Sequence, residues 1–428
     1  MLKTKLNPKT FLPKIKSIFF KIQRYQMYVA KNKHLVGTIS ESLLNVLHEL
    51  NNIHQSSIED VKKQELLYVL FKNSFPKVLW NWATEQKVKS ISIRFYDNVI
   101  AFVEGYEQYC NTGMTSPEAN HSSRQLYWMT DGKFNNFWVS FYGLFFPKYP
   151  KYLFSDQARN LGLTESRGLQ NIVQEIRDKG YHLFDEKLSR EICDRLTKFA
   201  ENALCKLAPH YPDISTEKYL RYDSDNPKSV TYRVDEQELA NNPDIQNLIA
   251  DSSIISVVQE YFGCRATLRD LSMWWSTAFL KGDADSSSAQ LYHWDGDSVK
   301  FINVFIYLTE VTSQNGPHCF VRGSHLTKPL SLLRDGRFSD QEIENFYGKE
   351  HMDEIVGKRG TIIAADTRAF HKGKALEHSE RLIIMLTFSM DLFGATYSSI
   401  QLSDGLTDAL SQSMKHFPYS YSKFRVGK

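Results

Sequence analysis

The sequence predicts an α+β protein in which a mostly helical N-terminal region precedes an antiparallel β-barrel or double-sheet jelly roll. Residues 40–110 carry leucine-rich stripes that recur at helical spacing. From about residue 270 the chain changes to short runs rich in β-branched and aromatic residues, separated by glycine and asparagine turns. Because no helices separate these strands, a barrel or a jelly roll is the expected architecture.

The first forty residues are rich in lysine and arginine and contain no acidic residue before Glu41. Apolar side chains recur among the basic ones at roughly helical spacing, which predicts a basic amphipathic helix. Such a helix either packs on the protein with its lysines in solvent or lies on an anionic membrane surface. We favour packing and keep peripheral membrane contact as the alternative.

Residues 1–160 are expected to form a helical, aromatic-rich N-terminal region. A polar stretch at 111–123 predicts a loop, and a dense aromatic block follows at 134–154. Pro147 and Pro150 break any helix within that block. Its aromatic side chains either cover a core or an interdomain face, which we favour, or wall an apolar binding site.

Residues 161–395 are expected to form a second domain that starts with helices. Leu169–Arg177 fits a short helix ended by Gly180. Ser189 is a suitable N-cap for the next helix, and a third helical stretch is predicted for residues 242–263.

Short strands fill most of the rest of this second domain. The strands that we expect are Tyr181–Phe184, Leu271–Phe279, Ala289–Asp295, Lys300–Leu308, His318–Val321, Gly360–Ala365 and Arg381–Ser389. Residues 206–240 are polar and predicted to be irregular, and residues 330–352 are expected to form a helix or a lid. Residues 396–428 are expected to be a C-terminal tail.

Composition excludes several classes of protein. A net charge of +3 on 428 residues is too small to indicate nucleic-acid binding. The five cysteines are scattered and never form a CxxC pair, which argues against a disulfide framework and a thiolate zinc site. No apolar run approaches the length of a membrane span, and no secretory signal is recognisable. We therefore expect a cytoplasmic protein.

The most informative motif is His293-Trp294-Asp295, in which a histidine and a carboxylate lie two residues apart. Residues i and i+2 of a strand point to the same face, so both side chains can bind one metal ion. An isolated His-x-Asp is common by chance, but a second histidine, His371, follows downstream. Two histidines and one carboxylate are the ligand set of non-haem Fe(II) oxygenases.

Three other histidines compete for the position of third ligand. His325 follows a Gly-Ser pair that predicts a turn, and His318 lies two residues beyond an Asn-Gly turn. His378 is only three residues before Arg381, too close for a loop between a ligand and the next strand. His371 fits best.

Arg381 opens the apolar strand Arg381–Ser389 and shares a strand face with Ile383, Met385 and Thr387. A guanidinium at the head of an apolar strand needs a partner, because burying an unpaired charge is costly. A carboxylate is the natural partner for its planar fork. The distal carboxylate of 2-oxoglutarate, whose other end chelates iron, fits this requirement.

Several segments together carry a resemblance to a known family. They are Gly180-Tyr181-His182-Leu183-Phe184, His293-Trp294-Asp295, Tyr307-Leu308-Thr309, Asn315-Gly316-Pro317-His318, Gly323-Ser324-His325, Gly360-Thr361-Ile362-Ile363, His371 and Arg381. In order, spacing and turns, residues 168–393 resemble the phytanoyl-CoA dioxygenase family of Fe(II)/2-oxoglutarate-dependent oxygenases. The resemblance covers about half of the chain and does not extend to residues 1–160.

The resemblance implies a double-stranded β-helix, which is a jelly roll, with helices packed on one side. The residues that match the family's iron ligands are His293, Asp295 and His371. Arg381 matches the residue that pairs with the C5 carboxylate of 2-oxoglutarate. The family often has a small hydroxyl residue two positions after the distal histidine, where this chain has Gly373. The residues expected to supply that contact instead are Asn303, Tyr307 and Thr387.

The implied activity uses Fe(II), 2-oxoglutarate and O2, hydroxylates a small molecule and releases succinate and CO2. Related halogenases have a small residue in place of the carboxylate ligand, so Asp295 favours hydroxylation. Desaturation, epimerisation and ring closure share the same chemistry and stay open. The alternatives outside catalysis are a jelly roll that only binds a metal or ligand, and a protein that binds partners through its N-terminal half.

Basic residues suggest a class of substrate. The basic N-terminus favours a lipid- or sugar-linked anionic molecule. Four further basic residues, expected near the mouth of the cleft, point the same way, although a solvated basic loop explains them equally well: Arg322, Lys328, Arg334 and Arg337.

Overall fold

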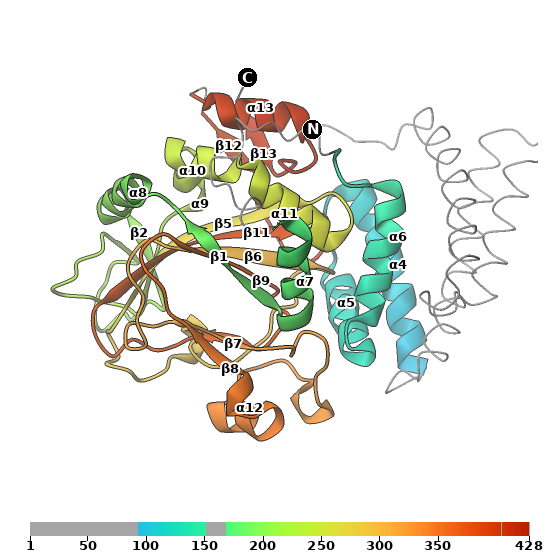
Figure 1. The fold of residues 1–428 in the computed structure, drawn as a ribbon, viewed down its shortest axis with the longest axis horizontal. Coiled ribbons are helices and arrows are strands. Elements are labelled where there is room, and N and C mark those ends of the chain that lie inside the picture. The colour runs from blue at the N-terminus through green and yellow to red at the C-terminus, as the bar shows by residue number, and fades with distance from the viewer. Residues whose placement is uncertain (1–92, 151–167, 404, 428) are drawn as a thin grey trace, which may run out of the picture. The chain divides into compact units, whose positions relative to one another are not determined.

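The computed structural model describes residues 93–150, 168–403 and 405–427 (Figure 1). The expected basic N-terminal helix and most of the leucine-rich stretch 40–110 lie outside this part. The chain forms two compact units, whose described residues are 93–145 with Phe393–Thr396 in the first, and 146–150, 168–392, 397–403 and 405–427 in the second. The domain limits expected from the sequence stay predictions, since the first falls among residues 151–167. No helix in the described ranges is both long and apolar enough to cross a membrane.

The first unit contains the helices α4 (Ile93–Thr112), α5 (Pro117–Thr130) and α6 (Lys133–Phe145). The loop expected at 111–123 is shorter than predicted, because the Ser116 side chain caps α5 by accepting a hydrogen bond from Ala119 N. Pro117 fits the first turn of that helix. Gly105 lets α4 approach α5 closely, since a Cβ at Gly105 would lie 2.1 Å from the Cβ of Ala119.

Phe102 lies at the centre of the aromatic core of the first unit. Its ring is edge-on to those of Phe134, Trp138 and Phe393, with centroids 5.1, 4.8 and 5.3 Å away. Phe134, Trp138 and Tyr142 are buried. Edge-to-face pairs of this kind add to the free energy gained from burial. For these members of the aromatic block, the prediction that they cover a core is confirmed.

Two antiparallel sheets build most of the second unit. The larger sheet has the strand order β1-β9-β6-β11-β5-β4-β2-β3, and the smaller has the order β10-β7-β8. The larger sheet contains β1 (Tyr181–Lys187), β2 (Cys205–Ala208), β3 (Tyr219–Leu220), β4 (Thr231–Arg233), β5 (Thr267–Thr277), β6 (Phe301–Tyr307), β9 (Thr361–Ala365) and β11 (Glu380–Ser389). The smaller sheet contains β7 (His318–Val321), β8 (Met352–Ile355) and β10 (His371–Gly373).

The expectation that residues 206–240 are irregular holds for most of this stretch but misses three short strands and the helix Glu236–Ala240. β4 pairs with β5, β2 with β4, and β3 with β2, so these short strands extend the larger sheet. Each has at most four residues, too few to show an alternating pattern. Pairing with a long neighbour stabilises them where their own sequence does not.

Apolar side chains from both sheets meet in one buried cluster. It includes Phe305 and Tyr307 from β6, Phe320 from β7, Ile355 from β8 and Ile383 from β11. From β5 to β11 the chain passes repeatedly between the two sheets. Figure 1 shows β7 and β8 facing β6 and β9. Two antiparallel sheets closed over a shared core form the double-sheet jelly roll expected from the sequence.

Helices flank the jelly roll. α7 (Leu169–Lys179) ends at Gly180, which has a φ of 94°, and Ser189 caps α8 (Arg190–Asn202), both as expected. The third helical stretch is divided into α10 (Pro243–Ile249) and α11 (Ser252–Phe262), because the Asp251 side chain caps a new helix. The other α-helices in the described part of this unit are α9 (Glu236–Ala240), α12 (Asp340–Tyr347) and α13 (Asp408–His416).

Residues 397–427, expected as a tail, belong to the second unit. Their strands β12 (Ile400–Leu402) and β13 (Phe424–Val426) pair in parallel. The Tyr421 hydroxyl donates a hydrogen bond to Ile249 O (2.7 Å), and Lys423 Nζ lies 2.5 Å from Glu236 Oε1. These contacts join the segment to the end of α10 and the start of α9.

Candidate active site

The segment that carries His293 and Asp295 runs beside β10 without forming a regular strand. The expected strand Ala289–Asp295 is reduced to isolated bridges, one of which pairs His293 with His371. These two residues exchange both backbone hydrogen bonds, with N to O distances of 3.0 and 2.9 Å. Asp295 N donates to Thr367 O (2.9 Å), in the loop before β10. Backbone pairing therefore brings the three candidate metal ligands together.

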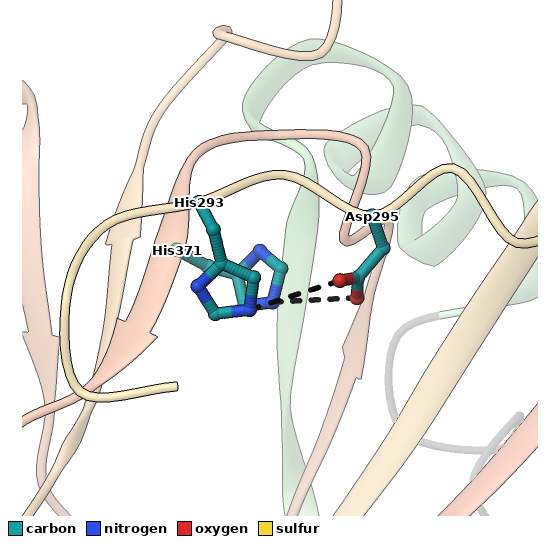
Figure 2. A group of neighbouring side chains, drawn as sticks. All are labelled: His293, Asp295 and His371. Atoms are coloured by element: carbon teal, nitrogen blue, oxygen red, sulfur yellow. Dashed lines mark ion pairs between the residues drawn. The ribbon is translucent and has the colours of Figure 1, made fainter. Parts of the chain in front are cut away.

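The side chains of His293, Asp295 and His371 converge (Figure 2). Asp295 Oδ2 lies 3.4 Å from His371 Nε2, and Asp295 Oδ1 lies 3.7 Å from His293 Nε2. One ligand atom from each residue lies within 4.8 Å of the other two. Two imidazole nitrogens and one carboxylate oxygen at such separations fit one metal ion and leave its other positions open.

Hydrogen bonds orient both imidazoles. Nδ1 of His293 lies 2.9 Å from Leu291 O, and Nδ1 of His371 lies 3.0 Å from Ala369 O. A carbonyl oxygen can only accept, so in each ring Nδ1 carries the proton. The lone pair of Nε2 is then free to bind a metal, as in most histidine ligands.

The protonation states also suit a divalent cation. Burial lowers the pKa of His293 to about 3, so its imidazole is neutral at physiological pH. Burial alone would raise the pKa of Asp295, but the imidazole of His371 and a hydrogen bond from Thr367 hold it well below its usual range. The group thus offers a charged carboxylate and a neutral nitrogen without rearrangement.

Thr367 supports Asp295, a role that the sequence does not predict. Its hydroxyl hydrogen-bonds to the Asp295 carboxylate and accepts a hydrogen bond from Asn303 Nδ2 at 2.9 Å. Asn303, expected to contact the co-substrate, therefore lies behind the carboxylate ligand, although its Oδ1 is buried and has no partner within the described chain. A lone threonine in a loop gives no sequence signal for this role.

A buried ion pair fixes the loop that carries Thr367. Arg368 binds Asp366 through Nε (2.8 Å) and Nη2 (2.5 Å), and Tyr261 donates its hydroxyl to the same carboxylate at 2.5 Å. Burial would raise the pKa of Asp366, yet Arg368 holds it well below its usual range. Lys328 Nζ donates to Arg368 O at 2.6 Å. These contacts hold the loop in the shape that aligns Asp295 with His371.

Arg381 is buried opposite Ser276 of β5. Its Nη2 donates to Ser276 Oγ (3.1 Å) and its Nη1 to Gly316 O, while its buried Nε has no hydrogen-bond partner among the described residues. Burial lowers its pKa, and no carboxylate in the described ranges forms an ion pair with it. A buried guanidinium without a counter-charge is costly, so this site fits an anionic ligand such as a carboxylate of 2-oxoglutarate.

The other expected co-substrate residues lie in different places. The Tyr307 hydroxyl donates to Ile355 O (2.9 Å) and accepts from His318 N (3.2 Å), and thereby ties β6 to β7 and β8. Thr387 shares the strand face of Arg381 but lies six residues along β11, about 20 Å away. Gly373 is the near neighbour, since a Cβ there would lie 3.4 Å from Arg381 Nη2.

The three competing histidines have other surroundings. His325 Nε2 donates to Arg177 O (2.9 Å) near the end of α7, and His378 is exposed. His318 is buried beside the metal ligands, and its ring lies nearly parallel to that of His371 with centroids 5.6 Å apart. It is not part of the group of ligand atoms that lie within 4.8 Å of one another.

The segment expected as a helix or lid contains α12 and is attached to the ligand-bearing strands. Tyr292 and Phe338 exchange backbone hydrogen bonds of 3.1 and 2.8 Å. Lys372 Nζ lies 2.5 Å from Asp340 Oδ1 at the start of α12. The insert therefore covers the outer side of the segments that hold His293 and His371.

The comparison with protein families agrees with this geometry. Residues 176–379 match the model of the family described as phytanoyl-CoA dioxygenase. No curated protein matches the chain. Among solved structures, the chain is similar to SnoN, a non-heme alpha-ketoglutarate-dependent epimerase from nogalamycin biosynthesis (18% identity, 51% of this chain and 82% of SnoN, TM-score 0.37).

Two further solved structures are similar at the same low level. HygX from Streptomyces hygroscopicus, with nickel, 2-oxoglutarate and hygromycin B bound, has 14% identity over 56% of this chain and 93% of its own, with a TM-score of 0.38. EctD from S. alaskensis, with bound Fe, has 17% identity over 54% and 82%, with a TM-score of 0.37. The assignment therefore rests on the family match and the site. The matched domain belongs to the phytanoyl-CoA dioxygenase family, and the protein is an Fe(II)/2-oxoglutarate-dependent oxygenase.

Proposed function

We propose that this oxygenase hydroxylates a small-molecule substrate and converts 2-oxoglutarate to succinate and CO2. The observation that carries the proposal is the convergence of His293, Asp295 and His371 in a jelly roll that also buries Arg381, which has no carboxylate partner among the described residues. When bound, Fe(II) supplies the activation of dioxygen. The carboxylate of Asp295 occupies the position that a halide would need, which favours hydroxylation over halogenation.

The protein's own residues provide orientation and shielding. The Nδ1 hydrogen bonds hold both imidazoles with Nε2 toward Asp295, and Thr367 holds the carboxylate. Arg381 binds the distal carboxylate of 2-oxoglutarate and so positions its other end near the metal ligands. Apolar side chains of the buried cluster, such as Phe305 and Ile363, keep water away from the co-substrate.

We propose a lipid- or sugar-linked anionic molecule as the substrate, bound by a protein that touches the membrane peripherally in the cytoplasm. The basic N-terminal segment supports this proposal. Of the four basic residues expected near the cleft, Arg322 pairs with Asp353 and Arg334 with Glu342. Lys328 is buried and bonded to backbone oxygens. Arg337 remains as a candidate, since among the described residues its guanidinium is engaged through Nε alone, by Ser286 O (3.0 Å).

An anaerobic titration with Fe(II) and 2-oxoglutarate tests the activity. We expect a saturable visible charge-transfer band that His371→Ala abolishes. His378→Ala is the matched control, because His378 is exposed and should leave the band intact. The absence of a band in folded wild-type protein would leave a jelly roll that binds a ligand without catalysis.

Hydroxylation and membrane contact need separate measurements. With a substrate found by screening for succinate release, labelled dioxygen should place one labelled oxygen atom in the product. A product without the label would indicate desaturation, epimerisation or ring closure instead. Full-length protein should sediment with phosphatidylglycerol vesicles and not with phosphatidylcholine vesicles, and equal binding to both would contradict the electrostatic membrane contact.

A further inference from the structure

The imidazole of His318 is buried, and the described residues offer its Nε2 no hydrogen-bond partner. His318 is the first residue of β7 and lies directly opposite Gly373 of β10. Its side chain is 5% exposed, and Nε2 is completely buried without a hydrogen-bond partner in the described part of the chain. A buried polar group left unpaired lowers stability, so such an atom calls for a ligand as its partner.

Aromatic packing fixes the position of this ring. The ring of Phe305 lies 4.5 Å from that of His318 between centroids, and Phe320 lies 5.7 Å away. On another side the ring is stacked on His371, tilted by only 13°. His318 is outside the group of converging metal ligands. Its ring contact with the ligand His371 places it to touch a molecule bound next to the metal.

Gly373 opens the space between His318 and Arg381. Side chains directly opposite each other in an antiparallel pair have their Cβ atoms about 5 Å apart and point to the same face. A Cβ at Gly373 would lie 3.4 Å from Arg381 Nη2. The imidazole and the guanidinium therefore lie on two sides of the volume that a larger residue at position 373 would fill.

Some hydrogen-bond donors around this volume have no acceptor among the described residues. A guanidinium has five N–H donors, and those of Arg381 engage Gly316 O and Ser276 Oγ. Since Ser276 Oγ accepts a hydrogen bond from Arg381, its own proton remains available to donate. Ser276 is buried, and its hydroxyl donates no hydrogen bond within the described ranges. Arg381, Ser276 and His318 thus present unused donors around one small space.

We propose that His318 and Ser276 complete the pocket that Arg381 provides for the distal carboxylate of 2-oxoglutarate. The Nε2–H of His318 donates to a carboxylate oxygen from the side opposite the guanidinium, and the Ser276 hydroxyl donates from β5. This assignment rests on the proposed function, because it takes 2-oxoglutarate as the ligand. It replaces the hydroxyl contact that Gly373 cannot make.

Two substitutions of His318 separate its polar role from its packing role. His318→Phe keeps an aromatic ring and removes the donor, whereas His318→Gln keeps an N–H donor near the position of Nε2. In anaerobic titrations of the full chain, His318→Phe should raise the Kd of 2-oxoglutarate about tenfold or more, with unchanged Fe(II) affinity. His318→Gln should recover most of the lost affinity.

An analogue shows which end of the co-substrate His318 contacts. 2-Oxopentanoate has the chain length and keto acid of 2-oxoglutarate but no distal carboxylate. If the proposal is correct, His318→Phe weakens 2-oxoglutarate and leaves the weaker binding of 2-oxopentanoate unchanged. An equal loss for both molecules would overturn it, because His318 would then act on the chelating end or on the fold. A wild-type protein that binds neither molecule would instead contradict the proposed function.

A second-site substitution offers a rescue. Gly373 has no positive φ that would strain a side chain. Adding Gly373→Ser to His318→Phe should therefore place a hydroxyl beside Arg381 and lower the Kd of 2-oxoglutarate again. An unchanged Kd for 2-oxoglutarate in Ser276→Ala would overturn the role of Ser276, and an unchanged Kd in His318→Phe would overturn that of His318.

Discussion

His293 and His371 are joined by a pair of backbone hydrogen bonds before their side chains meet at the metal-binding position. Their N to O distances are 3.0 and 2.9 Å, and their rings lie 4.3 Å apart between centroids. Because the backbone sets this separation, the two imidazoles lie close together without a bound metal. The site is preorganised, which lowers the conformational entropy lost when a metal binds.

Removing a metal ligand should abolish stoichiometric iron binding. In His371→Ala and in Asp295→Ala, two ligands remain, too few to hold Fe(II) against water. Iron content measured after anaerobic reconstitution and desalting should fall from about one per chain to near zero. His378→Ala, which changes an exposed histidine, should retain its iron. Full iron content in Asp295→Ala would exclude the carboxylate as a ligand.

Replacing Arg381 should separate co-substrate binding from metal binding. Arg381→Met keeps much of the apolar volume and removes the charge, so iron should stay bound. The affinity for 2-oxoglutarate should fall by roughly 2–5 kcal/mol, which is about 30-fold or more.

Arg381→Met should also change the thermal stability of the protein. Without ligand, the Tm of Arg381→Met should equal or exceed that of the wild type, because a buried charge without a carboxylate partner has been removed. The rise in Tm that 2-oxoglutarate produces in the wild type should be lost. Scanning calorimetry with and without 2-oxoglutarate measures both, and a large fall in the unliganded Tm would contradict the argument.

Thr367→Val tests the support of the carboxylate ligand. Valine has nearly the shape of threonine but cannot hydrogen-bond to Asp295 or accept from Asn303. Loss of such support usually costs ten- to a hundredfold in metal affinity, and we expect roughly that effect. Competition with a coloured chelator measures it. Thr197→Val on α8 is the control, since it loses a hydrogen bond from Arg359 and should bind metal normally.

Asp366 should contribute to stability in a pH-dependent way. Its folded-state pKa lies well below the ordinary value of 3.8, so its contribution is present above that value. The contribution is lost as the pH falls from about 4 toward the lower, folded-state pKa. At neutral pH, Asp366→Asn should lower the free energy of unfolding by about 3–5 kcal/mol, because Arg368 stays buried without its partner.

Urea unfolding at several pH values measures this effect. The difference between wild type and Asp366→Asn should be constant near neutrality and shrink below about pH 4. A difference that grows as the pH falls would have the wrong sign and would exclude a depressed pKa at Asp366.

Residue type and spacing are sufficient to predict the metal ligands and Arg381 as candidates. An i, i+2 pair and an arginine at the head of an apolar strand follow from local chemistry. The role of Ser276 depends on the register of β5 against β11, and that of Thr367 on the path of a loop. Neither leaves a periodic signal in the sequence. Pairing register and loop path are properties of the folded chain.

Thr387 is a candidate for contact with the co-substrate because alternation along a strand puts it on the same face of β11 as Arg381. Alternation does not give the position along the strand, and six residues separate the two side chains. The long strands β6 and β11 were predictable because their apolar runs are unbroken, whereas β2, β3 and β4 are too short to stand out. Tertiary pairing, rather than local preference, decides such short elements.

The charges of Asp295 and Arg381 cancel when both imidazoles are neutral, as metal ligands must be. Fe(II) alone adds two positive charges, and 2-oxoglutarate alone adds two negative ones. When both bind, the net charge of the site returns to zero. A net charge in a site that holds little water is costly. Iron and co-substrate should therefore strengthen each other's binding by the same factor. The enzyme can therefore bind iron and 2-oxoglutarate cooperatively through their charges, without a conformational change.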